Sequence, residues 1–189
     1  SANTALTYLR CDDNQLTSLD VSSNTALDYF LCYSNQLTSL DLSANTALEY
    51  LYCNDNQLTS LDVSSNLDLT NLQCHDNQLT SLDVSANTAL EDLNCSDNQL
   101  IHLNMKNGVT DALTTFNATN NSLTCIEILD LDYATEHWTD YTDEGVSFAV
   151  CCDLGDVSQW YVATTGSDTN CGNSEETPFA TIQLGIGSS

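Results

Sequence analysis

Residues 24–44 read N-T-A-L-D-Y-F-L-C-Y-S-N-Q-L-T-S-L-D-L-S-A, and this stretch is one of five near-identical 21-residue units that follow one another without a gap. The units start at Asn3, Asn24, Asn45, Asn66 and Asn87. A fixed period of this length predicts a solenoid, in which each coil packs only on its neighbours. Because solenoids mostly bind other molecules or build larger structures, the repeat favours those functions over catalysis.

Each unit contains two short stretches in which apolar and polar residues alternate. In the first unit Leu9 and Cys11 alternate with polar neighbours, which is the period of a half-buried strand, and Leu19 and Val21 predict a second extended stretch. Asn14 falls at the bend after the first strand, where a buried amide must bond backbone groups of its own coil and the next. The equivalent positions predict an asparagine ladder: Asn35, Asn56, Asn77, Asn98 and Asn121.

The pattern L-x-x-L-x-C-x-x-N-x-L resembles the leucine-rich repeat, in the 21-residue variety found in extracellular proteins of Bacteroidetes-type bacteria. The match covers residues 3–128, because a diverged sixth unit follows a two-residue insertion around Gly108. The repeat positions of that unit are Leu113, Phe116, Ala118, Asn121, Leu123 and Ile126. The resemblance implies a β-rich solenoid, curved, with a parallel sheet on its concave side, over residues 1–128. It implies no particular ligand.

Two further regions follow the repeats. Residues 129–155 resemble the C-terminal cap of such proteins, and the resemblance implies a disulfide from Cys125 to a cysteine at the end of the cap. A solenoid must cover its last coil, and Trp138, Phe148 and Val150 are apolar enough to do so. Residues 156–189 form a short extended tail, whose segment 161–183 resembles the first coil of a right-handed parallel β-helix. That fold occurs in many secreted proteins that act on polysaccharides.

The cysteines fall into two groups. Five share one inward repeat position and are expected to be buried, reduced thiols, because parallel Cβ vectors suit a disulfide poorly and one ligand per coil makes no metal cluster; they are Cys11, Cys32, Cys53, Cys74 and Cys95. Two disulfides are expected among the remaining four, which are Cys125, Cys151, Cys152 and Cys171. Four cysteines allow three pairings, and the sequence leaves the choice open.

The charge balance limits the partners. The formal net charge is −25, and Arg10 and Lys106 are the only strong bases. Nucleic acids and anionic membranes are therefore excluded as partners, because both require basic patches, and no apolar run is long enough to insert into a membrane. Such acidity favours an extracellular or cell-surface location. No signal peptide is visible, and the chain is taken as mature or trimmed.

Tyrosines gather at the outward strand positions of the first three units. They are Tyr8, Tyr29, Tyr33, Tyr50 and Tyr52. Aromatic side chains about 4.8 Å apart along a sheet form an amphipathic platform, which predicts a protein or glycan partner at the concave face. The alternative is that the tyrosines only stabilise exposed strands through cross-strand pairs.

Two columns of carboxylates also recur with the repeat. One contains Asp20, Asp41, Asp62 and Asp83, expected on the opposite strand, and the other contains Asp55, Asp76 and Asp97 at the bend beside the concave face. Turn hydrogen bonds could hold these carboxylates, and calcium bridging Asp55, Asp76 and Asp97 is the alternative. His75 precedes Asp76 but matches no metal or catalytic motif, so it is expected to be a surface histidine.

Catalytic motifs are missing from the sequence: it has no nucleophile elbow, no zinc-protease motif and no phosphate loop. The sequence thus predicts a non-enzymatic extracellular protein that acts by surface contact, in adhesion or self-assembly. An uncovered apolar edge at Leu6 and Leu9 would favour head-to-tail contact between copies. The alternative is a carbohydrate- or protein-targeting module of a longer secreted carbohydrate-active enzyme.

Overall fold

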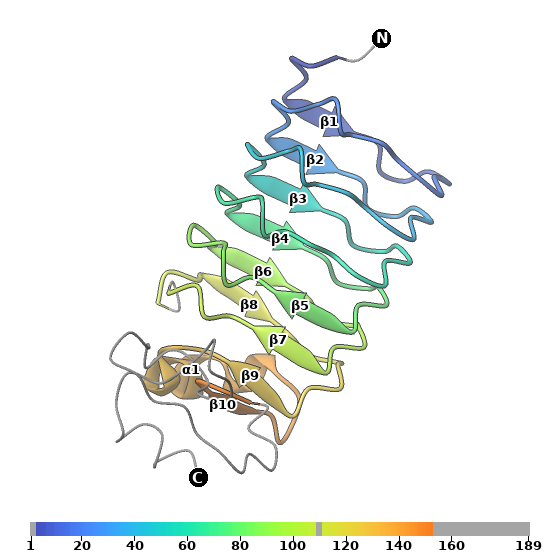
Figure 1. Cartoon of the computed structure of the whole chain (residues 1–189). Helices are drawn as coiled ribbons and strands as arrows, with labels where there is room; N and C mark the ends of the chain where they lie inside the picture. Colours follow the sequence, from blue (N-terminus) through green and yellow to red (C-terminus); the bar gives the residue numbers. More distant parts are fainter. Residues whose placement is uncertain (1–2, 109–110, 153–189) are drawn as a thin grey trace, which may run out of the picture.

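The computed structural model describes residues 3–108 and 111–152, which form a stack of short coils along one axis (Figure 1). Two parallel sheets run along this stack. The first sheet contains, in order, β1 (Tyr8–Arg10), β2 (Tyr29–Leu31), β3 (Tyr50–Tyr52), β4 (Asn71–Gln73), β6 (Asp92–Asn94) and β8 (Thr115–Asn117). The second sheet contains, in order, β5 (Ser81–Asp83), β7 (His102–Asn104), β9 (Cys125–Glu127) and β10 (Ser147–Ala149).

The register of the first sheet follows the repeat. Tyr8 pairs with Tyr29, and Tyr29 pairs with Tyr50, so equivalent positions of successive units lie side by side. The middle residue of each strand points inward, and Leu51, Leu72 and Leu93 are completely buried. The predicted solenoid with a parallel sheet is therefore confirmed, and its core is one continuous cluster built largely from columns of repeated leucines.

The asparagine ladder is confirmed, although its bonds run to the preceding coil rather than the following one. Nδ2 of Asn56 donates to the carbonyl oxygens of Cys32, Cys53 and Asn54 at 3.0, 3.1 and 3.1 Å. Its Oδ1 accepts from the backbone N of Leu37 at 2.9 Å. Asn121 repeats the pattern in the sixth coil. Each side chain thus joins two coils by bonds that buried backbone groups require.

A second asparagine ladder, at the first position of each unit, was missed by the sequence reasoning. Nδ2 of Asn45 donates to the carbonyl oxygens of Val21 and Asn24 at 3.1 and 2.8 Å. Asn66 and Asn87 make the equivalent bonds and are also fully buried. The signal was present in the sequence, since this asparagine returns in all five units.

The second extended stretch forms a sheet only from the fourth coil onward, which corrects the prediction that all the Asp20-type residues lie on a strand. Among residues 3–65 no second-sheet strand is present. Like charges directly opposite each other disfavour strand pairing, and this column carries aspartate in coils one to four. In the fifth coil the residue is Asn104, whose Nδ2 donates to Oδ2 of Asp83 at 3.2 Å. The pairing of β5 with β7 starts at this change of residue.

The cap covers the last coil as predicted. It contains α1 (Leu131–His137), η1 (Thr139–Tyr141) and β10. Trp138 is buried, and its ring lies 4.5 Å from that of Phe116 in β8 and 6.4 Å from that of Phe148. Val150 is half-buried. The division of the chain at residues 128 and 155 stays a prediction, and the tail at 156–189 lies outside the described residues.

A disulfide joins the sixth coil to the end of the cap. It links Cys125 to Cys152, 27 residues apart in sequence. Cys151 is also disulfide-bonded, and Cys171 lies outside the described residues. The five ladder cysteines carry free thiols, as expected; four are buried, and Cys11 in the first coil is half-buried.

An ion pair lies beside this disulfide. The carboxylate of Glu127 in β9 is buried and contacts Nζ of Lys106 at 2.9 Å. It also accepts a hydrogen bond from the backbone N of Cys152 at 3.4 Å, and Nε2 of His102 lies 3.8 Å away. One of the two strong bases of the chain therefore has a structural role, since a buried carboxylate requires such a partner.

Candidate functional site

Three tyrosines form a stacked row on the outer face of the first sheet. The ring centroids of Tyr8 and Tyr29 are 5.1 Å apart and those of Tyr29 and Tyr50 are 4.8 Å apart, with interplanar angles of 19° and 25°. The row follows directly from the in-register pairing of β1, β2 and β3, whose strand spacing sets the ring spacing. Because Tyr29 lies between two rings, both of its faces are covered.

The remaining two tyrosines line a shallow hollow beside this row. The hollow has a volume of about 380 Å³. Its lining residues come from the second, third and fourth coils: Leu31, Tyr33, Tyr52, Asn54, Gln73 and His75. The ring of Tyr52 lies 6.0 Å from that of Tyr29, so the hollow and the row are continuous. The structure thus places all five predicted tyrosines on one face and divides them into a row and a hollow.

Hydrogen bonds fix the polar groups around the tyrosines. Nε and Nη2 of Arg10 donate to the two carboxylate oxygens of Asp12 at 2.8 and 3.1 Å, and this bond holds the pKa of Asp12 below its usual value. A hydrogen bond to Asp12 raises the pKa of Tyr33. Burial, with a hydrogen bond to Tyr29, raises the pKa of Tyr52 to about 12. Both hydroxyl groups therefore remain neutral at physiological pH. The hydroxyl of Tyr33 already donates to Asp12, so it can only accept a hydrogen bond from a partner.

The carboxylates at the bend have a conformational explanation. Asp55, Asp76 and Asp97 have φ values of 53°, 52° and 53°, in the left-handed region. Aspartate and asparagine tolerate this region better than other side chains, and Asn120 occupies the same position in the sixth coil with φ 57°. The turn therefore favours aspartate or asparagine at this position, although Ser34 occupies it in the second coil with φ 52°. The prediction that calcium bridges these three residues stays a prediction.

The three aspartates differ in their surroundings. Oδ1 of Asp97 accepts a hydrogen bond from Nδ2 of Asn120 at 2.9 Å, and Oδ2 of Asp55 accepts one from Nδ2 of Asn54 at 2.6 Å. Burial raises the pKa of Asp76, and the charges of Asp55 and Asp97 add to this rise. The middle aspartate is thus the least favourably placed to carry its charge.

His75 lines the hollow and is partly exposed, in agreement with the predicted surface histidine, but part of its ring is buried. Its side chain is half-buried, and Nδ1 is fully buried with no hydrogen-bond partner among the described residues. A ring nitrogen of His75 and one carboxylate oxygen each of Asp55 and Asp76 lie within 4.8 Å of one another. The sequence reasoning missed this cluster, because two of its members belong to one coil and the third belongs to the coil before it.

The other carboxylate column has turn hydrogen bonds of its own. Oδ1 of Asp20 accepts from the backbone N and the hydroxyl group of Ser22 at 3.0 and 2.7 Å. Asp41 and Asp62 accept from Ser43 and Ser64 in the same way, and these bonds lower the pKa values of all three carboxyl groups. These carboxylates are therefore held by turn hydrogen bonds, which was one of the two explanations that the sequence suggested.

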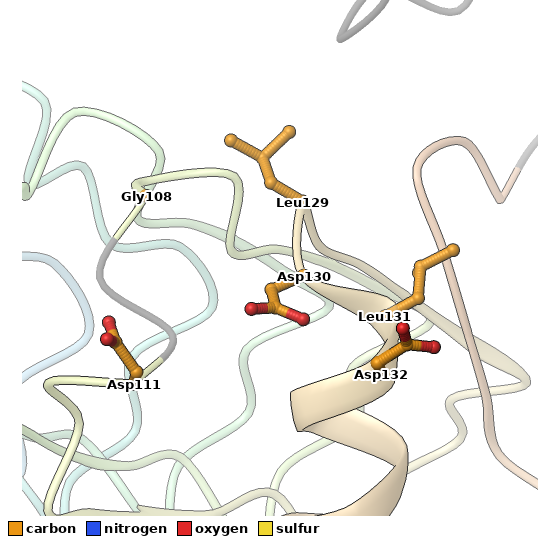
Figure 2. A pocket seen from close by; sticks show the side chains of 6 residues that line it. All are labelled: Gly108, Asp111, Leu129, Asp130, Leu131 and Asp132. Carbon is orange, nitrogen blue, oxygen red and sulfur yellow. The ribbon is translucent and has the colours of Figure 1, made fainter.

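Figure 2 shows another hollow, of about 520 Å³, at the junction of the fifth coil and the cap. It is lined by Gly108, Asp111, Leu129, Asp130, Leu131 and Asp132. Oδ1 of Asp130 accepts from the backbone N of Tyr133 at 3.0 Å and caps α1, so this carboxylate is structural. None of these residues was predicted as a site.

Comparison with solved structures identifies the fold. A leucine-rich repeat protein of Leptospira interrogans is 24% identical with a TM-score of 0.60, over 75% of this chain and 38% of that one. An internalin of Listeria monocytogenes, InlF, is 23% identical with a TM-score of 0.53, over 74% of this chain and 46% of that one. The chain has the leucine-rich repeat fold.

A third solved structure, the functional domain of InlJ from Listeria monocytogenes, is described as including a cysteine ladder. It is 28% identical with a TM-score of 0.39, over 85% of this chain and 49% of that one. The present chain covers less than half of the length of each of these three solved chains. No protein-family description matches the sequence, and no curated protein matches it. No helix among residues 3–108 and 111–152 is long and apolar enough to cross a membrane.

Proposed function

We propose that this leucine-rich repeat chain is a protein-binding domain that works outside the cell or at its surface, and that the tyrosines of the first sheet make the contact. The observation that carries the proposal is the stacked row of Tyr8, Tyr29 and Tyr50, continuous with the hollow at Tyr33 and Tyr52. Tyrosine is enriched at the energetic centres of protein interfaces because it combines a large apolar area with a hydroxyl group.

The stacking favours a protein partner over a glycan. A sugar ring binds an aromatic side chain best when it can lie on a free ring face. In the row each of the two faces of Tyr29 is covered by a neighbouring tyrosine, at 5.1 and 4.8 Å. Contacts through ring edges and hydroxyl groups instead suit the mixed apolar and polar surface of a protein. Tyr8, at the end of the row, is 52% exposed.

Two observations support an extracellular location. Disulfides persist mainly in oxidising compartments, and the cap carries one between Cys125 and Cys152. The net charge of −25 keeps the molecule soluble and repels nucleic acids and anionic membranes. Adhesion through a protein on another surface is the activity that these properties fit. Self-association head to tail stays a prediction, which light scattering of the intact chain at several concentrations would test.

The test uses arrays of extracellular proteins and of glycans, probed with the intact chain. Binders are then measured against a variant in which Tyr29, Tyr50 and Tyr52 are replaced by serine. We expect a protein among the binders, and we expect its affinity to be at least about tenfold weaker for the variant. Truncation of central aromatic residues typically costs about 2 kcal/mol or more each. The fold should persist, since these side chains lie outside the leucine columns.

The matched control is Tyr141→Ser, which removes a tyrosine that is 51% exposed in the cap, away from the row. This variant should bind like the unmodified chain. If the triple variant keeps its affinity, the tyrosines serve only to stabilise the strands and the proposal is wrong. Binding to glycans alone would instead support the alternative, a targeting module of a carbohydrate-active enzyme, to which the tail resemblance at 161–183 also points.

A further inference from the structure

The strongest unexplained feature lies where the third and fourth coils meet at the bend beside the hollow. A ring nitrogen of His75 and carboxylate oxygens of Asp55 and Asp76 lie within 4.8 Å of one another, close enough to surround a single ion. Asp55 and Asp76 are exposed, so an ion can reach them from solvent, while His75 is half-buried. Their positions are fixed, because both aspartates occupy the left-handed turn position of the repeat.

A second observation concerns the ring of His75, which shares the lack of a hydrogen-bond partner with Oδ1 of Asn45, Asn66 and Asn87 but lies beside two carboxylates. Its Nδ1 is buried and has no hydrogen-bond partner among the described residues. Buried polar atoms in folded proteins nearly always have a partner, and an exception requires an explanation. The repeat does not require a histidine here, because the equivalent position carries a different residue in each of the first five coils. These residues are Asp12, Tyr33, Asn54, His75 and Ser96.

We propose that Asp55, His75 and Asp76 bind one divalent transition-metal ion, with zinc as the best match. Zinc is bound by imidazole nitrogen and carboxylate oxygen, and three protein ligands with one open position form a common zinc arrangement. Imidazole also suits copper and nickel, whereas calcium takes oxygen ligands almost exclusively. The histidine thus distinguishes this site from the calcium bridge predicted for Asp55, Asp76 and Asp97.

The neighbouring aspartates explain why the site occurs once. Asp97 has the same backbone conformation as Asp76, but its Oδ1 accepts from Nδ2 of Asn120 at 2.9 Å, and the preceding residue in its coil is Ser96. Among the described residues, this is the one group of three or more histidine, cysteine or acidic side chains close enough to hold an ion. His75 also lines the hollow, so the proposed metal site borders the proposed binding surface.

The experiment titrates the intact, oxidised chain with zinc chloride by calorimetry at neutral pH, with calcium chloride as a competitor. We expect one zinc ion per chain, with no displacement by calcium. His75→Ala should weaken zinc binding by at least about tenfold, and so should Asp76→Asn. The latter variant keeps a residue that tolerates the left-handed turn, and circular dichroism confirms that it is folded. Cobalt in place of zinc should give a spectrum without a thiolate band.

Asp97→Asn is the matched control, because it changes the same column by the same substitution outside the cluster. It should bind zinc like the unmodified chain. Unchanged binding in both His75→Ala and Asp76→Asn would overturn the proposal, and so would an equal loss in Asp97→Asn, which would point to non-specific attraction by the acidic column. A cobalt spectrum with a thiolate band would assign the metal to cysteines instead.

Discussion

The cysteine that follows each first-sheet strand shows how one residue type serves the whole solenoid. Cys32, Cys53, Cys74 and Cys95 are completely buried, and burial raises the pKa of Cys53 and Cys95 to about 12 and that of Cys74 well above its usual value. The thiols therefore remain neutral and act as small apolar side chains. A larger residue at this position would have to fit against its own copies in the coils above and below.

This burial predicts that stability falls at high pH. The thiols keep their protons in the folded state up to a pKa of about 12 for Cys53 and Cys95, whereas in the unfolded chain they lose them near 9.0. Between these pH values the folded state binds more protons than the unfolded chain. The stability that the buried thiols contribute is therefore complete below pH 9.0 and is lost as the pH rises toward 12. Urea denaturation at a series of pH values should show the free energy of unfolding falling through this window.

Cys53→Ala provides the control for this effect, since other groups also titrate at high pH. The variant will be less stable overall, but its free energy of unfolding should fall less steeply with pH than that of the unmodified chain. Equal slopes in the two proteins would show that the buried thiol does not contribute.

At the scale of elements, the disulfide between the sixth coil and the end of the cap predicts a stability contribution. It closes a loop of 27 residues, for which the chain-entropy estimate is about 3.6 kcal/mol. Replacing both Cys125 and Cys152 by serine should therefore lower the free energy of unfolding in urea by about that amount. The cap should be affected first, so hydrogen exchange in α1 and β10 should accelerate before exchange in β2 or β3. Uniform acceleration along the solenoid would contradict this order.

The elements also show which parts of the fold could be predicted from sequence. The first sheet was predictable, because strict alternation at a fixed position in every unit sets both the strands and their register. The second extended stretch was also predictable, but the coil at which it begins to pair as a sheet was not, because the pairing starts where an aspartate is replaced by Asn104, which donates to Asp83. The short helix α1 was missed as well, although Asp130 followed by Leu131 is a recognisable start signal.

The candidate sites divide in the same way. The five tyrosines were predictable as a group, because the repeat period decides which face each one occupies. The cluster of Asp55, His75 and Asp76 was not predictable, because it depends on how the bends of two coils approach each other. One signal was available: an aspartate that returns directly after a buried strand marks a left-handed turn, which directs several carboxylates to one edge.

For the whole molecule, repetition concentrates charge of one sign. The net charge is −25, and carboxylates of equivalent positions lie one coil apart, nearer than the Debye length of about 8 Å at physiological salt. Their effect is visible in the second column, where the charges of Asp20 and Asp41 raise the pKa values of Asp41 and Asp62, against the larger opposing effect of the serine hydrogen bonds. The fold is therefore stable in spite of this repulsion.

This repulsion predicts that salt stabilises the protein. Raising sodium chloride from about 0.01 M to about 1 M shortens the Debye length from about 30 Å to about 3 Å. Salt then screens the repulsion between carboxylates. The screening stabilises the folded state more than the unfolded chain, because the carboxylates are closer together in the folded state. The melting temperature followed by circular dichroism should therefore rise with salt. Asp41→Asn and Asp62→Asn combined should reduce the size of that rise, because they remove adjacent charges and keep a side chain that can accept the turn bond from serine. A melting temperature that stays constant or falls with salt would show that the acidic columns are already fully solvated and do not oppose folding.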